Sequence, residues 1–236
     1  MDSEPVILIE NFLTKDECKY IEDFLYRKED EILSLNSISE EPDGPPTVTN
    51  SNYKNITTKV WTYNIFDYKE IYNILAPKYK KILTNDLFSK FNLHKHSTDE
   101  IWIRGWGNIW RKELFIGPHK HAGQGVEAYD KIRNTRFLVT HIFLSGPEHL
   151  GTHYLINGDQ TFYNIDGKKA YVSDYYHSGK AGQLAITTSD IKHWVNKNET
   201  DIPRISLAAD IRIDCSNYDV YNDPNGVTAL YLWREI

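Results

Sequence analysis

The sequence is poor in the residues that mark several classes of protein. Its 236 residues include only two cysteines, Cys18 and Cys215, which lie far apart in the chain and form no CxxC pair. A disulfide framework needs more cysteines at shorter spacings, so the chain is not a disulfide-stabilised scaffold. This cysteine content favours a reducing compartment, and we expect the protein to be cytoplasmic.

Long apolar runs and an excess of positive charge are also missing. No apolar run is long enough to span a bilayer, and the acidic N-terminal stretch resembles neither a signal peptide nor a transit peptide. Lysine and arginine number 27 against 33 aspartates and glutamates, which gives a formal net charge of -6. We therefore expect no membrane association, and the charge disfavours a nucleic-acid partner. The sequence leaves the oligomeric state open.

The composition that remains is that of a soluble globular chain, with 40% hydrophobic and 25% charged residues. We predict a single domain, residues 1–236, in which a helical flank, 1–100, precedes a β-rich core, 101–236. The proline- and acid-rich segment near 34–56 is predicted to be a mobile loop over the mouth of the core.

Two helical regions are predicted within the flank. Thr14 and Glu17 fit a capping box at the start of the first helix. An apolar stripe at helical spacing follows, made of Cys18, Ile21, Phe24 and Leu25. The second region runs from about Asp67 to Phe91, and Pro77 is expected to start a new helix or to kink this one.

The core reads as short strands separated by Gly, Asn, Asp and Pro turns. Roughly eight strands recur at a spacing of 8–12 residues. This spacing predicts a mainly β fold (α+β, with the helices at the N-terminal side) built as a sandwich, jelly roll or barrel.

Two identical His-Lys-His triplets occur, at 94–96 and at 119–121. The first is followed by a polar linker, and we interpret it as a solvated connection. The second lies between two strongly β segments, after Gly117-Pro118. Residues i and i+2 of an extended segment point the same way, so His119 and His121 can face one cavity and bind a metal. An HxH pair by itself is weak evidence.

A third histidine and an arginine strengthen the hypothesis. His193 begins a distant strand, and imidazoles from two strand ends can hold Fe, Zn, Cu or Ni while leaving positions open. Arg204 follows in "PRISLAADIRI", where alternation places Arg204, Ser206, Ala208 and Asp210 on one face. If that face lines the barrel, Arg204 needs an anion, because an unpaired buried charge costs about 3–5 kcal/mol. A bound dicarboxylate has the matching geometry.

This pattern resembles the Fe(II)- and 2-oxoglutarate-dependent oxygenases. Within them it is most similar to the prolyl-hydroxylase-like group, including the uncharacterised "PHxH" members. The likeness runs through "ENFLTKDECKYIEDFL", "WGNIWRKELFIGPHKH" and "FLVTHIFLSGPEHLGTHYLI", and is most specific in "GQLAITTSDIKHWVNKNETDIPRISLAADI". The resemblance implies a double-stranded β-helix, also called a jelly roll, with Fe(II) at its mouth.

The resemblance also implies roles for individual residues. His119 and His193 would be metal ligands, and Arg204, assisted by Ser206, would bind the distal carboxylate of 2-oxoglutarate. With O₂ as cosubstrate, the reaction would release succinate and CO₂ while a prime substrate is oxidised. We expect that substrate to be a protein side chain or a small molecule that is hydroxylated.

The chain departs from the family pattern at two points. The family usually has Asp or Glu two residues after the first histidine, where this chain has His121. His121 can complete a three-histidine site, Glu127 can supply a carboxylate instead, or the position can stay open to water or an anion. Trp110 stands where many relatives carry a tyrosine near the cosubstrate, which leaves Asn108 as the candidate for a second 2-oxoglutarate contact.

Two other functions compete with an oxygenase. A cupin-like metalloenzyme would use HxH, a following glutamate and a distal histidine, but it would give Arg204 and Ser206 no role. A non-catalytic jelly-roll binding protein would use its histidines only structurally.

Overall fold

A computed structural model describes residues 5–35, 55–60, 62–91, 100–121, 138–157, 162–165, 168–171, 173–213 and 233–236. The helices are α1 (Lys15–Leu33), the 3-10 helices η1 (Ile56–Lys59) and η2 (Ile65–Asp67), α2 (Lys69–Ile82) and α3 (Asn85–Lys90). The strands are β1 (Ile7–Ile9), β2 (Ile101–Trp110), β3 (Ile116–His119), β4 (Leu138–Ser145), β5 (Thr152–Leu155), β6 (Phe162–Ile165), β7 (Lys168–Tyr171), β8 (Tyr175–His177), β9 (Leu184–Thr188), β10 (Lys192–Val195), β11 (Arg204–Ile213) and β12 (Arg234–Glu235). Within these ranges, none of the helices is both long and apolar enough to cross a membrane.

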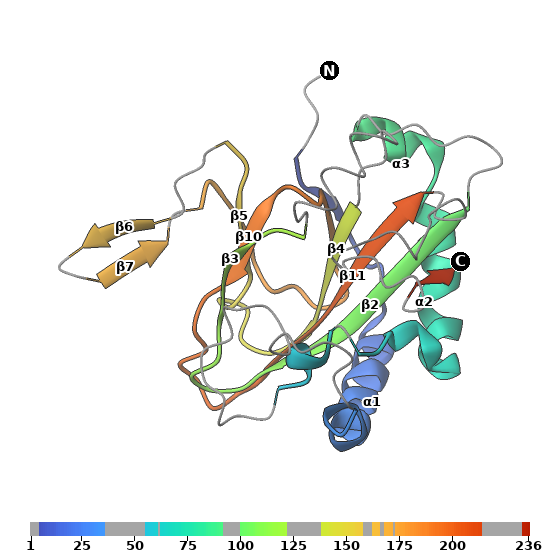
Figure 1. Ribbon diagram of the computed structural model, residues 1–236, viewed down its shortest axis with the longest axis horizontal. Coiled ribbons are helices and arrows are strands. Elements are labelled where there is room, and N and C mark those ends of the chain that lie inside the picture. Colours follow the sequence, from blue (N-terminus) through green and yellow to red (C-terminus); the bar gives the residue numbers. More distant parts are fainter. Residues whose placement is uncertain are drawn as a thin grey trace, which may run out of the picture.

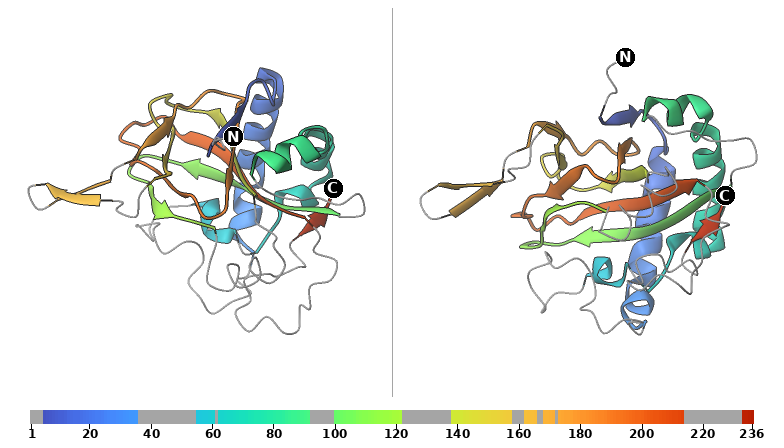
Figure 2. Two further views of the ribbon diagram at one scale, coloured as in Figure 1. Left: turned by 90° about the horizontal axis from the view of Figure 1, so that it is seen from above. Right: turned by 45° about the horizontal axis from the view of Figure 1, so that its top comes forward.

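Two antiparallel sheets form the core, as the strand spacing predicted. The larger has six strands in the order β1-β9-β4-β11-β2-β12, and the smaller has four in the order β3-β10-β5-β8 (Figure 1). The sheets enclose a common interior, the arrangement of a jelly roll. The hairpin of β6 and β7 projects away from this body, as both views of Figure 2 show. The mainly β fold with flanking helices is therefore confirmed.

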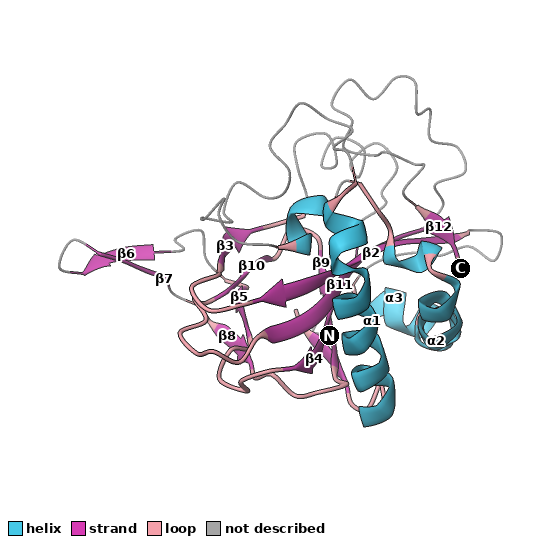
Figure 3. Ribbon diagram, turned by 90° about the horizontal axis from the view of Figure 1, so that it is seen from below, coloured by secondary structure: helices cyan, strands magenta, loops and turns pink. Residues whose placement is uncertain are grey.

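The helices cover the outer face of the six-stranded sheet (Figure 3). The predicted capping box is present, since Glu17 accepts from the Thr14 amide at 2.8 Å and Thr14 accepts from the Glu17 amide at 3.2 Å. The close approach of α1 to β2 requires a glycine, because a Cβ at Gly107 would come within 2.3 Å of Leu25. The predicted apolar stripe of α1 is buried against the sheet: Cys18, Ile21, Phe24 and Leu25.

The second helical region divides later than its proline suggested. Helix α2 continues through Pro77, and the next helix begins only at Asn85. The Tyr79 hydroxyl lies 2.8 Å from the Thr140 hydroxyl of β4, which fixes α2 on the sheet. The predicted loop near 34–56 lies outside the described residues except at its two ends.

Strand β11 is buried on both faces, and its alternation is as predicted. Its odd positions pack in the hydrophobic core beneath the helices: Ile205, Leu207, Ala209 and Ile211. The even positions face the interior of the jelly roll, opposite β2, where Arg204 pairs with Trp110 and Ser206 pairs with Asn108. The fold thus buries Arg204 and Asp210 along one inner face, with relative exposures of 3% and 5%.

Candidate metal centre

Three histidines meet at one end of the interior. His119 ends β3 and lies opposite His193 of β10, and His121 follows two residues later. The ring centroids are 4.4 Å apart for His119 and His193, 4.9 Å for His121 and His193, and 5.5 Å for His119 and His121. One nitrogen from each ring lies within 4.8 Å of the other two. The three predicted ligands are therefore close enough to share one metal ion.

Hydrogen bonds fix the orientation of each ring. The Nδ1 atom of His119 donates to the Gly117 carbonyl at 3.0 Å, and that of His193 donates to the Ile191 carbonyl at 3.1 Å. The Nδ1 atom of His121 lies 2.5 Å from a carboxylate oxygen of Asp210. With Nδ1 engaged in this way, Nε2 of every ring carries the lone pair that a metal binds.

Burial keeps the imidazoles of His119 and His193 in the form that binds metals. Burial, with a smaller contribution from His121, lowers the pKa of His119 to about 4. Burial, together with the neighbouring His119 and His141, holds the pKa of His193 well below its usual value. Both rings are consequently neutral at pH 7, and the donor set suits Fe(II) among other divalent metals.

Asp210 is part of the site, although sequence reasoning gave it no role. Its second carboxylate oxygen accepts from Arg104 at 2.7 Å. Burial alone would raise the pKa of Asp210, but the charges and hydrogen bonds of His121 and Arg104 outweigh it and hold this pKa far below its usual range. A signal was present in the alternation of β11, which had already placed Asp210 on the same face as Arg204.

Arg204 is a buried cation held by neutral groups. Its Nε donates to the Leu150 carbonyl at 2.6 Å, and its two terminal nitrogens donate to the hydroxyls of Ser206 at 2.8 Å and Thr152 at 3.2 Å. The guanidinium carbon lies 5.6 Å from the centre of the Phe143 ring. Among the described residues, no carboxylate pairs with it. Burial lowers the Arg204 pKa to about 10, so the side chain remains charged at pH 7.

Ser206 and Asn108, the residues predicted to bind 2-oxoglutarate beside Arg204, form a short chain of polar groups with it. Asn108 donates to the Ser206 hydroxyl over a long 3.4 Å and accepts from the Thr57 hydroxyl of η1 at 2.8 Å. Ser206 thus stands between Asn108 and Arg204. The structure brings these predicted residues together in one buried network.

His141 and Tyr154 also lie in the interior, next to His193. The His141 ring centroid is 4.5 Å from that of His193, and its Nδ1 lies 3.1 Å from the Tyr154 hydroxyl. His153, by contrast, stacks at 5.3 Å on Trp194 on the outer face of the smaller sheet. Only the pairing of strands across the interior could separate these two histidines.

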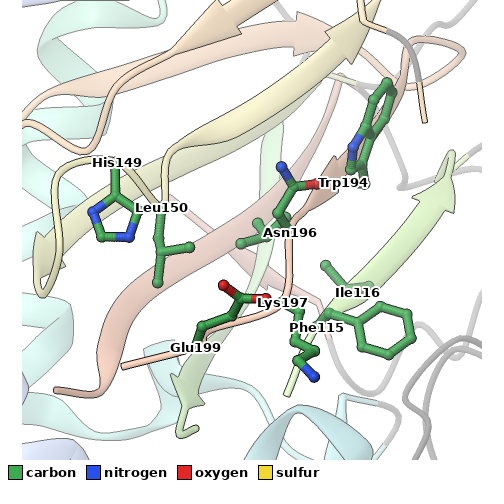
Figure 4. A pocket seen from close by; sticks show the side chains of 9 residues that line it. Phe115, Ile116, His149, Leu150, Trp194, Asn196, Lys197 and Glu199 are labelled. Carbon is green, nitrogen blue, oxygen red and sulfur yellow. The ribbon is translucent and has the colours of Figure 1, made fainter. Parts of the chain in front are cut away.

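Glu127, the alternative third ligand, lies outside the described residues, as does the triplet at 94–96. A cavity of about 540 Å³ lies next to the Arg204 site, and Figure 4 shows His149 and Phe115 on opposite sides of this cavity. None of the three clustered histidines lines it. It adjoins the Arg204 site through Leu150, which lines the cavity and accepts from the guanidinium.

No protein-family model and no curated protein matches the sequence. Several solved structures match the fold. EvdO2 from Micromonospora carbonacea var. aurantiaca superposes with a TM-score of 0.54 at 14% identity, over 90% of this chain and 87% of that chain. The same protein complexed with 2-oxoglutarate gives 0.52 at 14% identity over the same shares, and apo EctD from S. alaskensis gives 0.52 at 12% identity over 89% and 73%.

The fold is therefore the jelly roll of these solved structures, one of which was determined in complex with 2-oxoglutarate. Within it, this chain places a cluster of three histidines at the end of an interior that also holds a buried arginine.

Proposed function

We propose that the protein is an Fe(II)- and 2-oxoglutarate-dependent oxygenase. The observation that carries this proposal is Arg204, which is 3% exposed, charged and surrounded by neutral acceptors. A buried charge without a counter-ion is strongly unfavourable, and a guanidinium binds a carboxylate through two parallel hydrogen bonds. The distal carboxylate of 2-oxoglutarate would supply the missing anion, with Ser206 and Thr152 completing its contacts and Asn108 supporting Ser206.

The histidine cluster fits the metal that this chemistry needs. His119, His121 and His193 offer three imidazole nitrogens, a donor set that suits Fe(II) and would leave positions for further ligands. Bound iron would couple the oxidative decarboxylation of 2-oxoglutarate, to succinate and CO₂, to oxidation of the prime substrate. The protein itself would bind and orient both substrates and exclude water.

The third ligand in this proposal is His121. Its ring lies within the cluster, and because its Nδ1 is engaged by Asp210, its Nε2 is the nitrogen left to bind a metal. Glu127 remains the alternative.

For the prime substrate we propose a protein side chain or a small molecule, hydroxylated in the cytoplasm. The net charge of -6 argues against a nucleic acid.

Thermal unfolding tests the proposal. Mn(II), a redox-inert substitute for Fe(II), is added with and without 2-oxoglutarate while the melting temperature is followed. A ligand at 100 times its dissociation constant stabilises by about 2.7 kcal/mol. An oxygenase responds to Mn(II) and further to 2-oxoglutarate in its presence. A response to metal alone would indicate the cupin-like enzyme, and a response to neither would indicate a binding protein.

A further inference from the structure

We propose that Asp210 is a positioning residue for the metal centre, acting through His121 and providing the negative charge that the three-histidine set lacks. This inference rests on the proposed function, because it assigns Asp210 a task only if His121 binds the metal.

The contact is specific to one of the three histidines. His119 and His193 each donate to the backbone carbonyl of the residue two positions earlier, which is a neutral acceptor. His121 alone has a carboxylate at its Nδ1, at 2.5 Å. A carboxylate in this position fixes the ring and increases the electron density at Nε2, so it strengthens the ligand.

The carboxylate is held rigidly. One oxygen faces His121, and the other accepts from Arg104 at 2.7 Å, from the position directly opposite on β2. Trp106 fills the same corner, with its ring 5.3 Å from the Arg104 guanidinium and 5.6 Å from the His121 ring. Because both oxygens are engaged and the side chain is buried, Asp210 has little freedom to turn away from His121.

The position of the Asp210 carboxylate explains how a histidine, His121, can occupy the position where the family resemblance leads us to expect an acidic ligand. A conventional Asp at position 121 would place a negative charge directly on the metal. Here the negative charge sits one imidazole away, on Asp210. The centre therefore keeps a nearby anion although none of the three proposed ligands is a carboxylate.

The competing explanation is that Asp210 serves only to neutralise Arg104 and so to stabilise the fold. The chain offers a matched control in Glu29, a second buried carboxylate paired with an arginine. Glu29 is 8% exposed and accepts from Arg111 at 2.7 and 2.8 Å, away from the histidines.

The first experiment compares D210N with E29Q by calorimetric titration with Mn(II). Loss of an outer-shell carboxylate costs roughly 10- to 100-fold in metal affinity, and we expect this loss in D210N and unchanged affinity in E29Q. The visible absorption of the Co(II)-substituted protein should also change in D210N alone. Wild-type affinity in D210N, or an equal loss in E29Q, overturns the inference.

The second experiment moves the charge. D210N is compared in the His121 background and in H121D, where the carboxylate would bind the metal itself. We expect D210N to weaken Mn(II) binding in the first background and to leave it unchanged or strengthen it in the second, because two carboxylates then no longer crowd together. If Asp210 has only a structural role, D210N should lower the Mn(II) affinity equally in both backgrounds, and this result would overturn the inference. Because the two backgrounds are compared with each other, the test remains valid even if D210N is partly unstable.

The two failures are distinguishable. If the wild-type protein binds neither Mn(II) nor 2-oxoglutarate, the proposed function fails. If the wild type binds both and D210N behaves like E29Q, only the role of Asp210 fails.

Discussion

His193 and His119 lie directly opposite each other on the antiparallel strands β10 and β3, with their ring centroids 4.4 Å apart. Backbone pairing rather than side-chain flexibility therefore sets the distance between two of the three candidate ligands. His121 joins them from the residue pair that follows β3, anchored by its amide, which donates to the Ser189 carbonyl at 3.1 Å. Strand pairing and a backbone hydrogen bond thus hold the three histidines close together.

Replacing His193 by Ala should abolish metal binding. The change removes one of three proposed ligands, so we expect Mn(II) affinity to fall by more than about 100-fold, beyond the loss typical of an outer-shell residue. Metal content after dialysis, measured by mass spectrometry, provides the readout. The control replaces both His94 and His96 by Ala and should leave the metal content unchanged. A loss of metal content in this control variant would indicate that the metal binds at the triplet 94–96 instead.

The identity of the third ligand is decided by a pair of variants. His121→Ala should lower Mn(II) affinity to nearly the extent of His193→Ala, because its ring completes the cluster. Glu127→Gln should bind Mn(II) like the wild type. The opposite ranking, measured by the same titration, would make Glu127 the ligand.

Arg204→Met should weaken 2-oxoglutarate far more than metal. Truncating one partner of a buried charge pair costs about 2–5 kcal/mol, so the dissociation constant for 2-oxoglutarate should rise by at least about 30-fold. Ser206→Ala removes one hydrogen bond of about 1 kcal/mol and should raise it only about five-fold. Titration of 2-oxoglutarate into the Mn(II)-loaded protein measures both. An equal loss of metal affinity in Arg204→Met would point to misfolding instead.

The metal-free protein should lose stability in mild acid. The folded-state pKa of His119 is about 4, below the ordinary 6.5, so between these values the unfolded chain binds a proton that the folded chain does not. The free energy of unfolding should therefore fall as the pH drops from 6.5 toward 4, by about 3 kcal/mol from His119 alone. Urea unfolding at several pH values measures this slope, and His119→Ala should flatten it. An identical slope in that variant would refute the buried, neutral state of His119.

Local signals in the sequence sufficed for much of the fold. The capping box of α1 and its apolar stripe depend on residues three or four positions apart, and both are as predicted. The alternation of β11 depends on neighbours two apart, and it grouped Arg204 with Ser206, Ala208 and Asp210 on one face correctly. The structure shows that this face is the buried, inner one. Of the two outcomes predicted for Pro77, the start of a new helix does not occur: α2 continues through it, and its face carrying Tyr79 packs on the sheet.

Long-range pairing explains what sequence reasoning missed. Asp210 contacts His121 because β11 and the end of β3 lie close together in space. No sequence pattern near either residue predicts this contact. Thr152 reaches Arg204, and His141 reaches Tyr154, by the same means.

The sequence by itself determined the chemistry available: which strands alternate, where imidazoles stand two residues apart, and which face of its strand carries an arginine that needs an anion if it is buried. Only the tertiary structure decided which of these groups meet, that a carboxylate supports His121, and that no described acid neutralises Arg204. The physical reason is that side-chain direction follows from local backbone period, whereas the partner across a sheet depends on how distant strands pair.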